Sequence, residues 1–429
     1  MHATNRFPDN KPSRRRPTRL IIAAVIALTM AGQVHAQYWT TPAPVTLPSI
    51  PSGTYNITSY GASTGSSNNA TAIQNAINAA SAAGGGTVQV PSGTFLSGPI
   101  TMKSKINLNL ASGATLKMLP YGTWPGNTVF ISGSGLTDIE LSGTGTIDGQ
   151  GAAWWAAFAS NSAVLRPQEV SLGNSTRVEI TGIHLQNSPE EHIWVKGDTD
   201  LTVSGITINT TASNAKNTDG IDLTATNAYL VNNNITCGDD NIAMSGTHID
   251  IENCTFGPGH GCSIGSITSN GVSFVTVHGC TFNGTTSGIR MKSARGRGGV
   301  VQYIAYNNNT MSSVQHPIWI SSYYPTDPTN PTLDPAQAVT STTPIWKHIK
   351  IQSLTVTGSS EAGTMFGLPE EKVSDVTLDN VKISATTGMR IFHAASIVFQ
   401  NGSSVTASSG NPVTIDDAAV SGITTHAYP

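Results

Sequence analysis

Charged and aromatic side chains are scarce in this sequence of 429 residues, at 11% and 6% of the chain. With 38% hydrophobic residues, so low a charged fraction argues against an intrinsically disordered chain. The formal net charge is −3, so the basic surface that nucleic-acid binding needs is missing. Few strong helix formers are present, which argues against coiled coils and helical bundles. The 43 glycines, with many Ser, Thr and Asn residues, favour β structure with frequent turns.

Long apolar segments are also missing, except for one short run near the N-terminus. Basic residues at 14–16 and 19 precede an apolar run over 20–32, and the small residues Val34 and Ala36 follow. This pattern predicts a signal peptide over residues 1–36, cleaved near Ala36. We therefore expect an extracellular or periplasmic protein with no membrane attachment after cleavage. The alternative is an N-terminal membrane anchor, for which the apolar run is short.

Cysteine is rare, and all four cysteines lie within one stretch, at Cys237, Cys254, Cys262 and Cys280. Their spacing matches neither a disulfide-dense scaffold nor a zinc site. One or two disulfide bonds and partly buried thiols are both compatible with an exported chain.

A short phrase recurs along the chain, with alternating apolar residues on both sides of a Gly, Asn or Ser. Its copies lie at 178–185, 201–208, 249–256, 275–282, 349–356 and 376–383. Alternation predicts short strands with one face inward, and the central residue predicts a bend with unusual backbone angles. Neighbouring copies start 23 to 27 residues apart, as at 178 and 201 or at 349 and 376. Repetition at this period predicts stacked coils that share one core, as in a parallel β-helix. Propellers and sandwiches would need more hairpin turns than the sequence offers.

We therefore predict an all-β protein, with an N-terminal arm over 37–54 and a single parallel β-helix domain over 55–429. One helix is expected at 71–83, where it would cap the open end of the stack. Its apolar face would consist of Ala72, Ile73, Ala76, Ile77 and Ala80. A proline-rich stretch at 325–344 is expected to form a surface loop on the binding face.

Four polar clusters fall near the edges of the repeats, at 217–220 (Asn-Thr-Asp-Gly), 238–240 (Gly-Asp-Asp), 259–261 (Gly-His-Gly) and 290–292 (Arg-Met-Lys). Asp219 and Asp239 are 20 residues apart, and so are Asp240 and His260. This spacing is close to the length of one coil, so we expect the side chains of these clusters to meet on one face. Each cluster alone is an ordinary turn or strand sequence. Together they gather three carboxylates, a histidine and two cations.

Closely placed carboxylates are typical of enzymes that transfer a glycosyl group to water. An arginine and a lysine beside them would bind a negatively charged sugar. Hydrolysis of a uronic-acid polymer follows as a hypothesis. A calcium site is the alternative for the acids, although the cations would oppose it.

In order and spacing, these four motifs resemble those of the polygalacturonases of glycoside hydrolase family 28. Further similar segments are Tyr-Gly-Ala at 60–62, Gly-Gly-Thr-Val at 85–88, Ile-Asp-Gly at 147–149, Trp-Trp at 154–155 and Asn-Ser-Pro at 187–189. The resemblance covers residues 55–395 and implies a right-handed parallel β-helix. It also implies a hydrolysis that inverts the configuration of the sugar at the cleaved bond.

The resemblance assigns catalytic roles to four residues of this sequence. Asp239 would be the general acid, and Asp219 and Asp240 would activate the attacking water. His260 would tune the protonation of the acid and hold its geometry.

The resemblance also assigns substrate-binding roles to residues of this sequence. Arg290 and Lys292 would bind the galacturonate carboxylate, and Asn217 would contact the sugar. A tyrosine that follows in many relatives matches Tyr324 better than Tyr323. No metal or other cofactor is expected, and nothing in the sequence requires an oligomer, so we expect a monomer.

Three features depart from the family pattern. A disulfide bond of fungal members is absent because Asn241 and Phe256 occupy its positions. Serines replace the polar neighbours of the tyrosine, and Glu190 and Glu191 follow the Asn-Ser-Pro segment, where relatives have an aromatic residue. These two acids would shift substrate preference or would be solvated.

Four alternative functions share parts of this pattern. An exo-acting polygalacturonase and a rhamnogalacturonan hydrolase come from the same family. A pectate lyase would instead need calcium and an arginine base, and a non-catalytic carbohydrate-binding β-helix would not need the four clusters. We favour endo-action on polygalacturonate.

Overall fold

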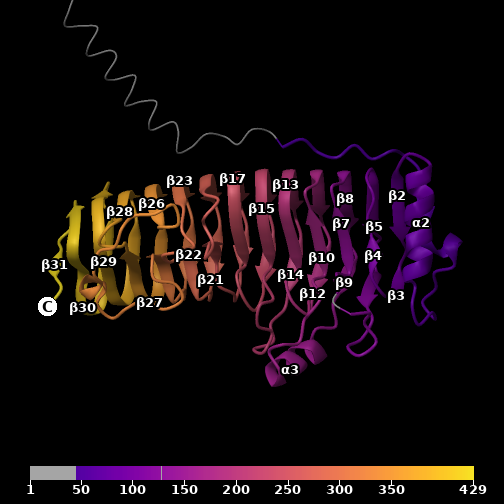
Figure 1. The fold of residues 1–429 in the computed structure, drawn as a ribbon, viewed down its shortest axis with the longest axis horizontal. Coiled ribbons are helices and arrows are strands. Elements are labelled where there is room, and N and C mark those ends of the chain that lie inside the picture. The colour runs from indigo at the N-terminus through magenta and orange to yellow at the C-terminus, as the bar shows by residue number, and fades with distance from the viewer. Residues whose placement is uncertain (1–44, 127) are drawn as a thin grey trace, which may run out of the picture. The chain divides into compact units, whose positions relative to one another are not determined.

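The computed structural model describes residues 45–126 and 128–429. Within these ranges the chain winds through parallel strands that stack side by side in successive coils (Figure 1). Each coil contributes to three parallel ladders, which we call ladders A, B and C. The predicted all-β parallel β-helix is confirmed. The predicted signal peptide and the first part of the N-terminal arm lie outside the described residues.

The ladders are defined by which strands pair with one another. Ladder A contains β1 (Thr54–Asn56), β2 (Gly86–Val90), β5 (Ile106–Leu110), β8 (Thr137–Gly143), β11 (Thr176–Thr181), β20 (Val272–His278), β23 (Val300–Asn307), β26 (Ile345–Gln352) and β28 (Val373–Asp379). Ladder B contains β3 (Gly93–Ser97), β6 (Ala114–Met118), β9 (Thr146–Asp148), β12 (His184–Gln186), β14 (Thr207–Asn209), β16 (Asn234–Thr236), β18 (Thr255–Phe256), β21 (Thr281–Asn283) and β24 (Thr310–Ser312). Ladder C contains β4 (Ile100–Thr101), β7 (Ile131–Ser134), β10 (Val170–Gly173), β19 (Cys262–Ile264), β22 (Ser287–Lys292), β25 (His316–Ser321) and β31 (His426–Ala427).

Several long strands run from one ladder into the next. Those that pass from ladder C into ladder A are β13 (Ile193–Ser204), β15 (Ile221–Val231) and β17 (Ile242–Glu252). Near the C-terminus, β27 (Thr355–Phe366), β29 (Lys382–Gln400) and β30 (Ser404–Ser421) begin in ladder B.

The bend at the centre of each repeated phrase has the geometry that its sequence predicts. All six central residues adopt positive φ between 51° and 72°, and they are Gly182, Gly205, Asn253, Gly279, Ser353 and Asn380. Only residues that tolerate the left-handed region fit there at low cost. The apolar residues on either side point inward and form one continuous core. Stacking of identical phrases therefore builds the interior coil by coil.

The predicted capping helix is also present. Helix α2 spans Ala70–Ala82 and lies at the β2 end of the stack (Figure 1). Its buried residues are the five that the sequence predicts. They cover core that would otherwise face water at the first coil.

A second helix was not predicted. Helix α3 spans Ala152–Ser160 and buries Trp154 and Trp155. Trp155 donates from Nε1 to the carbonyl oxygen of Ser188, at 3.0 Å. This bond joins the Trp-Trp and Asn-Ser-Pro segments across 33 residues of sequence. Two short 3-10 helices, η2 (Ile57–Tyr60) and η3 (Pro331–Leu333), complete the described helical structure. None of the described helices is long and apolar enough to cross a membrane.

All four cysteines are buried free thiols, so the structure favours the buried-thiol interpretation. Cys254 and Cys280 occupy the same phrase position on neighbouring coils, and the amide of Cys254 lies 3.4 Å from Sγ of Cys280. At the position of the absent fungal disulfide, the buried amide of Asn241 accepts from the backbone of Gly261, at 2.8 Å. It also donates to the carbonyl oxygen of Ile235. Hydrogen bonds thus hold this turn without a covalent link.

Candidate active site

The four polar clusters lie close together where successive coils enter ladder C, as their spacing predicts. The acids of the first two clusters lie in the turns that lead into β15 and β17. His260 lies in the turn before β19, and Arg290 and Lys292 lie on β22. These four strands are successive members of ladder C, because β15 pairs with β17, β17 with β19 and β19 with β22. The side chains therefore come from four consecutive coils.

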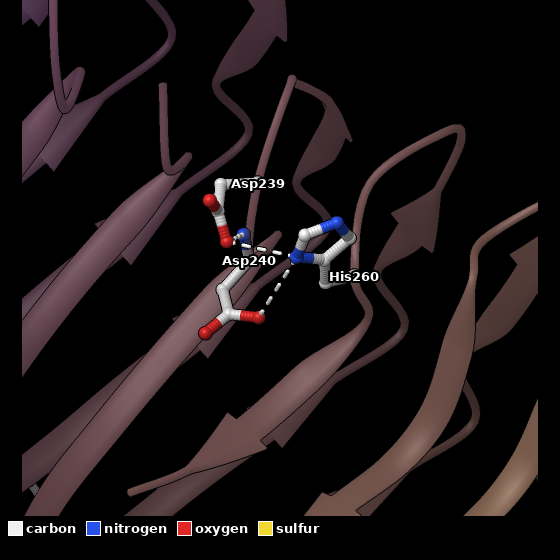
Figure 2. A group of neighbouring side chains, drawn as sticks. All are labelled: Asp239, Asp240 and His260. Carbon is white, nitrogen blue, oxygen red and sulfur yellow. Dashed lines mark hydrogen bonds and ion pairs between the residues drawn. The ribbon is translucent and has the colours of Figure 1, made fainter. Parts of the chain in front are cut away.

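Asp239 is tied to His260, as Figure 2 shows. Nδ1 of His260 lies 2.8 Å from Oδ1 of Asp239 and 3.8 Å from Oδ1 of Asp240. A carboxylate only accepts hydrogen bonds, so the proton of this pair lies on Nδ1 when Asp239 is ionised. The amide of Asn217 donates to Oδ2 of Asp239, at 3.3 Å. Both oxygens of Asp239 are thus oriented by neighbouring clusters.

Asp240 is buried among positive charges. Lys292 donates to its Oδ2, at 2.9 Å, and Arg290 donates to its Oδ1. The hydroxyl of Ser263 on β19 donates to Oδ1 as well, at 2.7 Å. Two cations beside Asp240 exceed its charge by one, and the Asp239 carboxylate balances this excess while it is ionised; the excess is exposed when Asp239 is protonated, as a general acid must be. This excess is next to Asp239, where an anionic group of a ligand would be attracted.

The backbone of Asp219 is held by a residue whose role the sequence did not reveal. His192 is fully buried and donates from Nδ1 to the carbonyl oxygen of Asp219, at 2.9 Å. Its Nε2 accepts from the hydroxyl of Thr210, at 2.8 Å. Burial lowers the pKa of His192 to about 4, so the ring is neutral at physiological pH. A neutral His192 therefore positions Asp219 without adding charge to the site.

Asp219 and Asp239 have opposite pKa shifts. Burial raises the pKa of Asp219 well above its usual value, and the charges of Asp222 and Asp239 raise it further. Burial also acts to raise the pKa of Asp239, but the hydrogen bond from His260 and the charges of His260 and Lys292 outweigh it. The pKa of Asp239 consequently lies below its usual value. Carboxyl groups with separated pKa values are typical of sites with distinct proton donors and acceptors.

A buried arginine outside the predicted set supports Asn217. Arg166 donates to Oδ1 of Asn217, at 3.1 Å, and to the carbonyl oxygen of Pro189. It also pairs with Glu190, at 3.4 Å. Glu191 accepts a hydrogen bond from Gln168, at 3.1 Å. Both glutamates have partners within the protein, which argues against the alternative that they are simply solvated. No signal in a single sequence links Arg166 to a residue 51 positions away.

The two candidate tyrosines have different environments. The ring of Tyr324 lies 5.2 Å from Nζ of Lys292, within range of a cation–π contact. Tyr323 instead donates from its hydroxyl to Asp334, at 3.1 Å, in the proline-rich segment. Tyr324 is therefore the tyrosine beside the predicted cations.

Two groups of described residues have metal-ligating atoms within 4.8 Å of one another. One is Asp239, Asp240 and His260, and the other is Asp250, Glu252 and His278 on ladder A. In the first group the cations on Asp240 would repel a dication. In the second group the imidazole of His278 lies 3.0 Å from Asp250 as an ion pair. Neither group has a feature beyond its geometry that points to a metal.

Open space lies on both sides of the acids along the outer face of ladder C. On the N-terminal side is a cavity of about 330 Å³ bordered by Lys196, which also borders a cavity of about 350 Å³ beside the coils of the acids and of His260. On the C-terminal side is a cavity of about 120 Å³. It is bordered by His316, Trp319 and Arg390, and also by Asp327 of the proline-rich segment. This segment therefore contributes to the face that carries the site.

The sequence model of glycosyl hydrolases family 28 matches residues 81–408. The chain belongs to glycoside hydrolase family 28. The predicted family and the prediction of an enzyme are both confirmed.

Two polygalacturonases are similar to this chain over 70% and 47% of its length. An endo-polygalacturonase from Pectobacterium carotovorum subsp. carotovorum is 31% identical over 338 residues, covering 70% of this chain and 80% of that protein. A polygalacturonase from Cryptomeria japonica is 36% identical over 216 residues, covering 47% of this chain and 42% of that protein.

Solved structures agree in fold. A polygalacturonase from Erwinia carotovora ssp. carotovora matches with a TM-score of 0.69 and 28% identity, covering 83% of this chain and 100% of that one. An exopolygalacturonase from Thermotoga maritima matches with a TM-score of 0.71 and 19% identity, covering 92% and 96%. At that identity the second likeness shows only the fold.

Proposed function

We propose that this protein is a secreted endo-polygalacturonase that hydrolyses the α-1,4 linkages of de-esterified pectin. The observation that carries the proposal is the pair of buried cations, Arg290 and Lys292, directly beside the acids. They hold Asp240 between them, and with Asp239 protonated as a general acid they leave one positive charge unbalanced there. A galacturonate carboxylate is an anion that matches this charge, and a neutral sugar would not make use of it.

In the proposed reaction, Asp239 protonates the glycosidic oxygen while Asp219 and Asp240 activate a water on the opposite face. The cations that lower the pKa of Asp239 in the free enzyme are the same groups that would bind the substrate carboxylate. Substrate binding would offset their charge and exclude water, so it would raise the pKa of Asp239 toward its role as an acid. The raised pKa of Asp219 makes its carboxylate, once ionised, a stronger base. Inversion of configuration and independence from metal ions remain part of the proposal.

Endo-action is favoured by the cavities on both sides of the acids. Internal cleavage needs room for several sugar units on each side of the cut, whereas release from chain ends needs one side closed. Open space on both sides of the acids, around Lys196 and around Trp319, supports the first arrangement. The similarity to an endo-polygalacturonase is consistent with this choice.

The test is digestion of polygalacturonate by the mature protein with a chelator present. Reducing ends, ultraviolet absorbance and viscosity are followed together. We expect new reducing ends, no unsaturated product and an early fall in viscosity. An unsaturated product would indicate a lyase, a slow fall in viscosity would indicate exo-action, and activity only on rhamnogalacturonan would assign the sister specificity.

A further inference from the structure

We propose that Lys196 and Trp194 form a binding subsite for a uronate unit on the N-terminal side of the catalytic acids. Both residues lie on β13, which is two strands before β17 in ladder C. At about 4.8 Å per coil, β13 lies about 10 Å from β17 along the stack, and Asp239 and Asp240 lie in the turn before β17. The inference rests on the proposed function and specifies which part of the groove selects long chains.

The strand pairing places these side chains on the outer face of the ladder. Trp194 is in register with Ser171 on one side and with Asp222 on the other. Lys196 is in register with Gly173, which has no side chain to fill the space beside it. This missing side chain contributes to the hollow of about 330 Å³ next to Lys196.

A β-bulge lies at the same point of β13. The register with β15 shifts between Lys196 and Asp198, where Gly197 has φ of 82°. Bulges change the direction of the side chains next to them and are frequent near functional sites. This bulge lies where the two cavities meet, and Lys196 borders both of them.

The chemistry of the subsite suits a uronate. Nζ of Lys196 lies 5.2 Å from the ring centre of Trp194 and 3.6 Å from Oδ2 of Asp222. Its side chain is 33% exposed, so a ligand carboxylate can reach the ammonium group. An aromatic face beside it offers a surface for the apolar side of a sugar ring. Ser171 and Ser134, which also border the hollow, supply hydroxyls for hydrogen bonds.

Asp222 competes for Lys196 but does not cancel the subsite. Its Oδ1 is buried without a hydrogen-bond partner among the described residues, and its Oδ2 is the partner of Lys196. A separation of 3.6 Å is longer than a strong charge-assisted hydrogen bond. A uronate carboxylate at closer range would therefore add an interaction that the free protein does not already satisfy.

The test compares Lys196→Ala with Lys117→Ala. Lys117 on β6 is a matched control outside ladder C, because its Nζ lies 3.5 Å from Asp148 and its side chain is 34% exposed. For Lys196→Ala we expect kcat/KM to fall about tenfold on a galacturonate octamer. On the shortest oligomer that is cleaved, kcat/KM should stay unchanged. Lys117→Ala should match the wild type on both. An equal fall at every chain length, or no fall at all, would overturn the subsite.

A binding measurement tests the subsite without depending on turnover. The octamer is titrated calorimetrically into the Asp239→Asn variant and into the same variant carrying Lys196→Ala or Trp194→Leu. Weaker binding of about tenfold for either double variant, with Asp239→Asn/Lys117→Ala unchanged, supports the subsite. Equal affinities for all of them refute it. A wild-type protein that binds the octamer but releases no reducing ends would refute the proposed function alone.

Discussion

Replacing Lys292 by methionine tests how charge controls this site. The ammonium group of Lys292 lies 2.9 Å from Asp240 in a buried setting. Methionine fills similar space without the charge. Asp240 keeps the hydrogen bonds from Arg290 and Ser263, so it remains compensated. We therefore expect the variant to fold.

The size of the effect follows from these contacts. Breaking a buried ion pair completely costs about 3–5 kcal/mol of stability, because one charge is left without a partner. Arg290 still pairs with Asp240 here, so the loss of stability should be smaller than that. Loss of one charge-assisted contact to the substrate carboxylate is worth about 1.5–3 kcal/mol, or about tenfold to a hundredfold in KM.

The variant should also shift the pH dependence in a defined direction. Lys292 is one of the charges that lower the pKa of Asp239, so its removal raises that pKa. The alkaline limb of kcat, which reports the enzyme–substrate complex in which Asp239 acts as the general acid, then moves to higher pH. Profiles of Lys292→Met and wild type on polygalacturonate measure this, with Lys117→Met as the control. A limb that stays in place or moves to lower pH would show that Asp239 is not the acid that this limb reports.

Three further predictions concern other parts of the chain. Asp239→Asn should lower kcat by about 10²–10⁴-fold, while affinity for oligogalacturonate, measured by calorimetry, changes little because the amide oxygen still accepts from His260. Wild-type turnover by this variant would contradict the site. Glu169 is fully buried with both carboxylate oxygens unbonded among the described residues, and burial followed by the charge of Asp148 raises its pKa well above the usual value. Glu169 therefore ionises at lower pH in the unfolded chain than in the folded protein. Between those two pKa values the free energy of unfolding falls by about 1.4 kcal/mol for each pH unit. Glu169→Gln should consequently unfold at a higher temperature than wild type by a margin that grows from pH 4 to pH 7, and a constant margin would exclude this cause. N-terminal sequencing of the exported protein should begin at Gln37, and a retained Met1 would contradict the predicted cleavage.

Much of the architecture could be predicted from local sequence. The repeated phrase has a period of two on both sides of a residue that tolerates positive φ, and both features act within a few residues. Helix α2 has five apolar residues on one face, a pattern of period 3.6. Helix α3 was missed because its tryptophans, phenylalanine and alanines surround it without a polar face. Its position depends on the contact of Trp155 with Ser188 from a later coil.

The candidate site, like the fold, could be predicted only in part from the sequence. A spacing near one coil was enough to predict that Asp219, Asp239, His260 and Arg290 meet on one face, because stacked coils convert sequence period into proximity. Residue order was therefore enough to predict the fold class, the family resemblance and which residues gather at the site. The direction of each pKa shift, the support from Arg166 and His192, and the cavities beside Lys196 became evident only in the folded chain. Burial and charge depend on side chains from several coils at once, and the contacts of each side chain cannot be read from residue order.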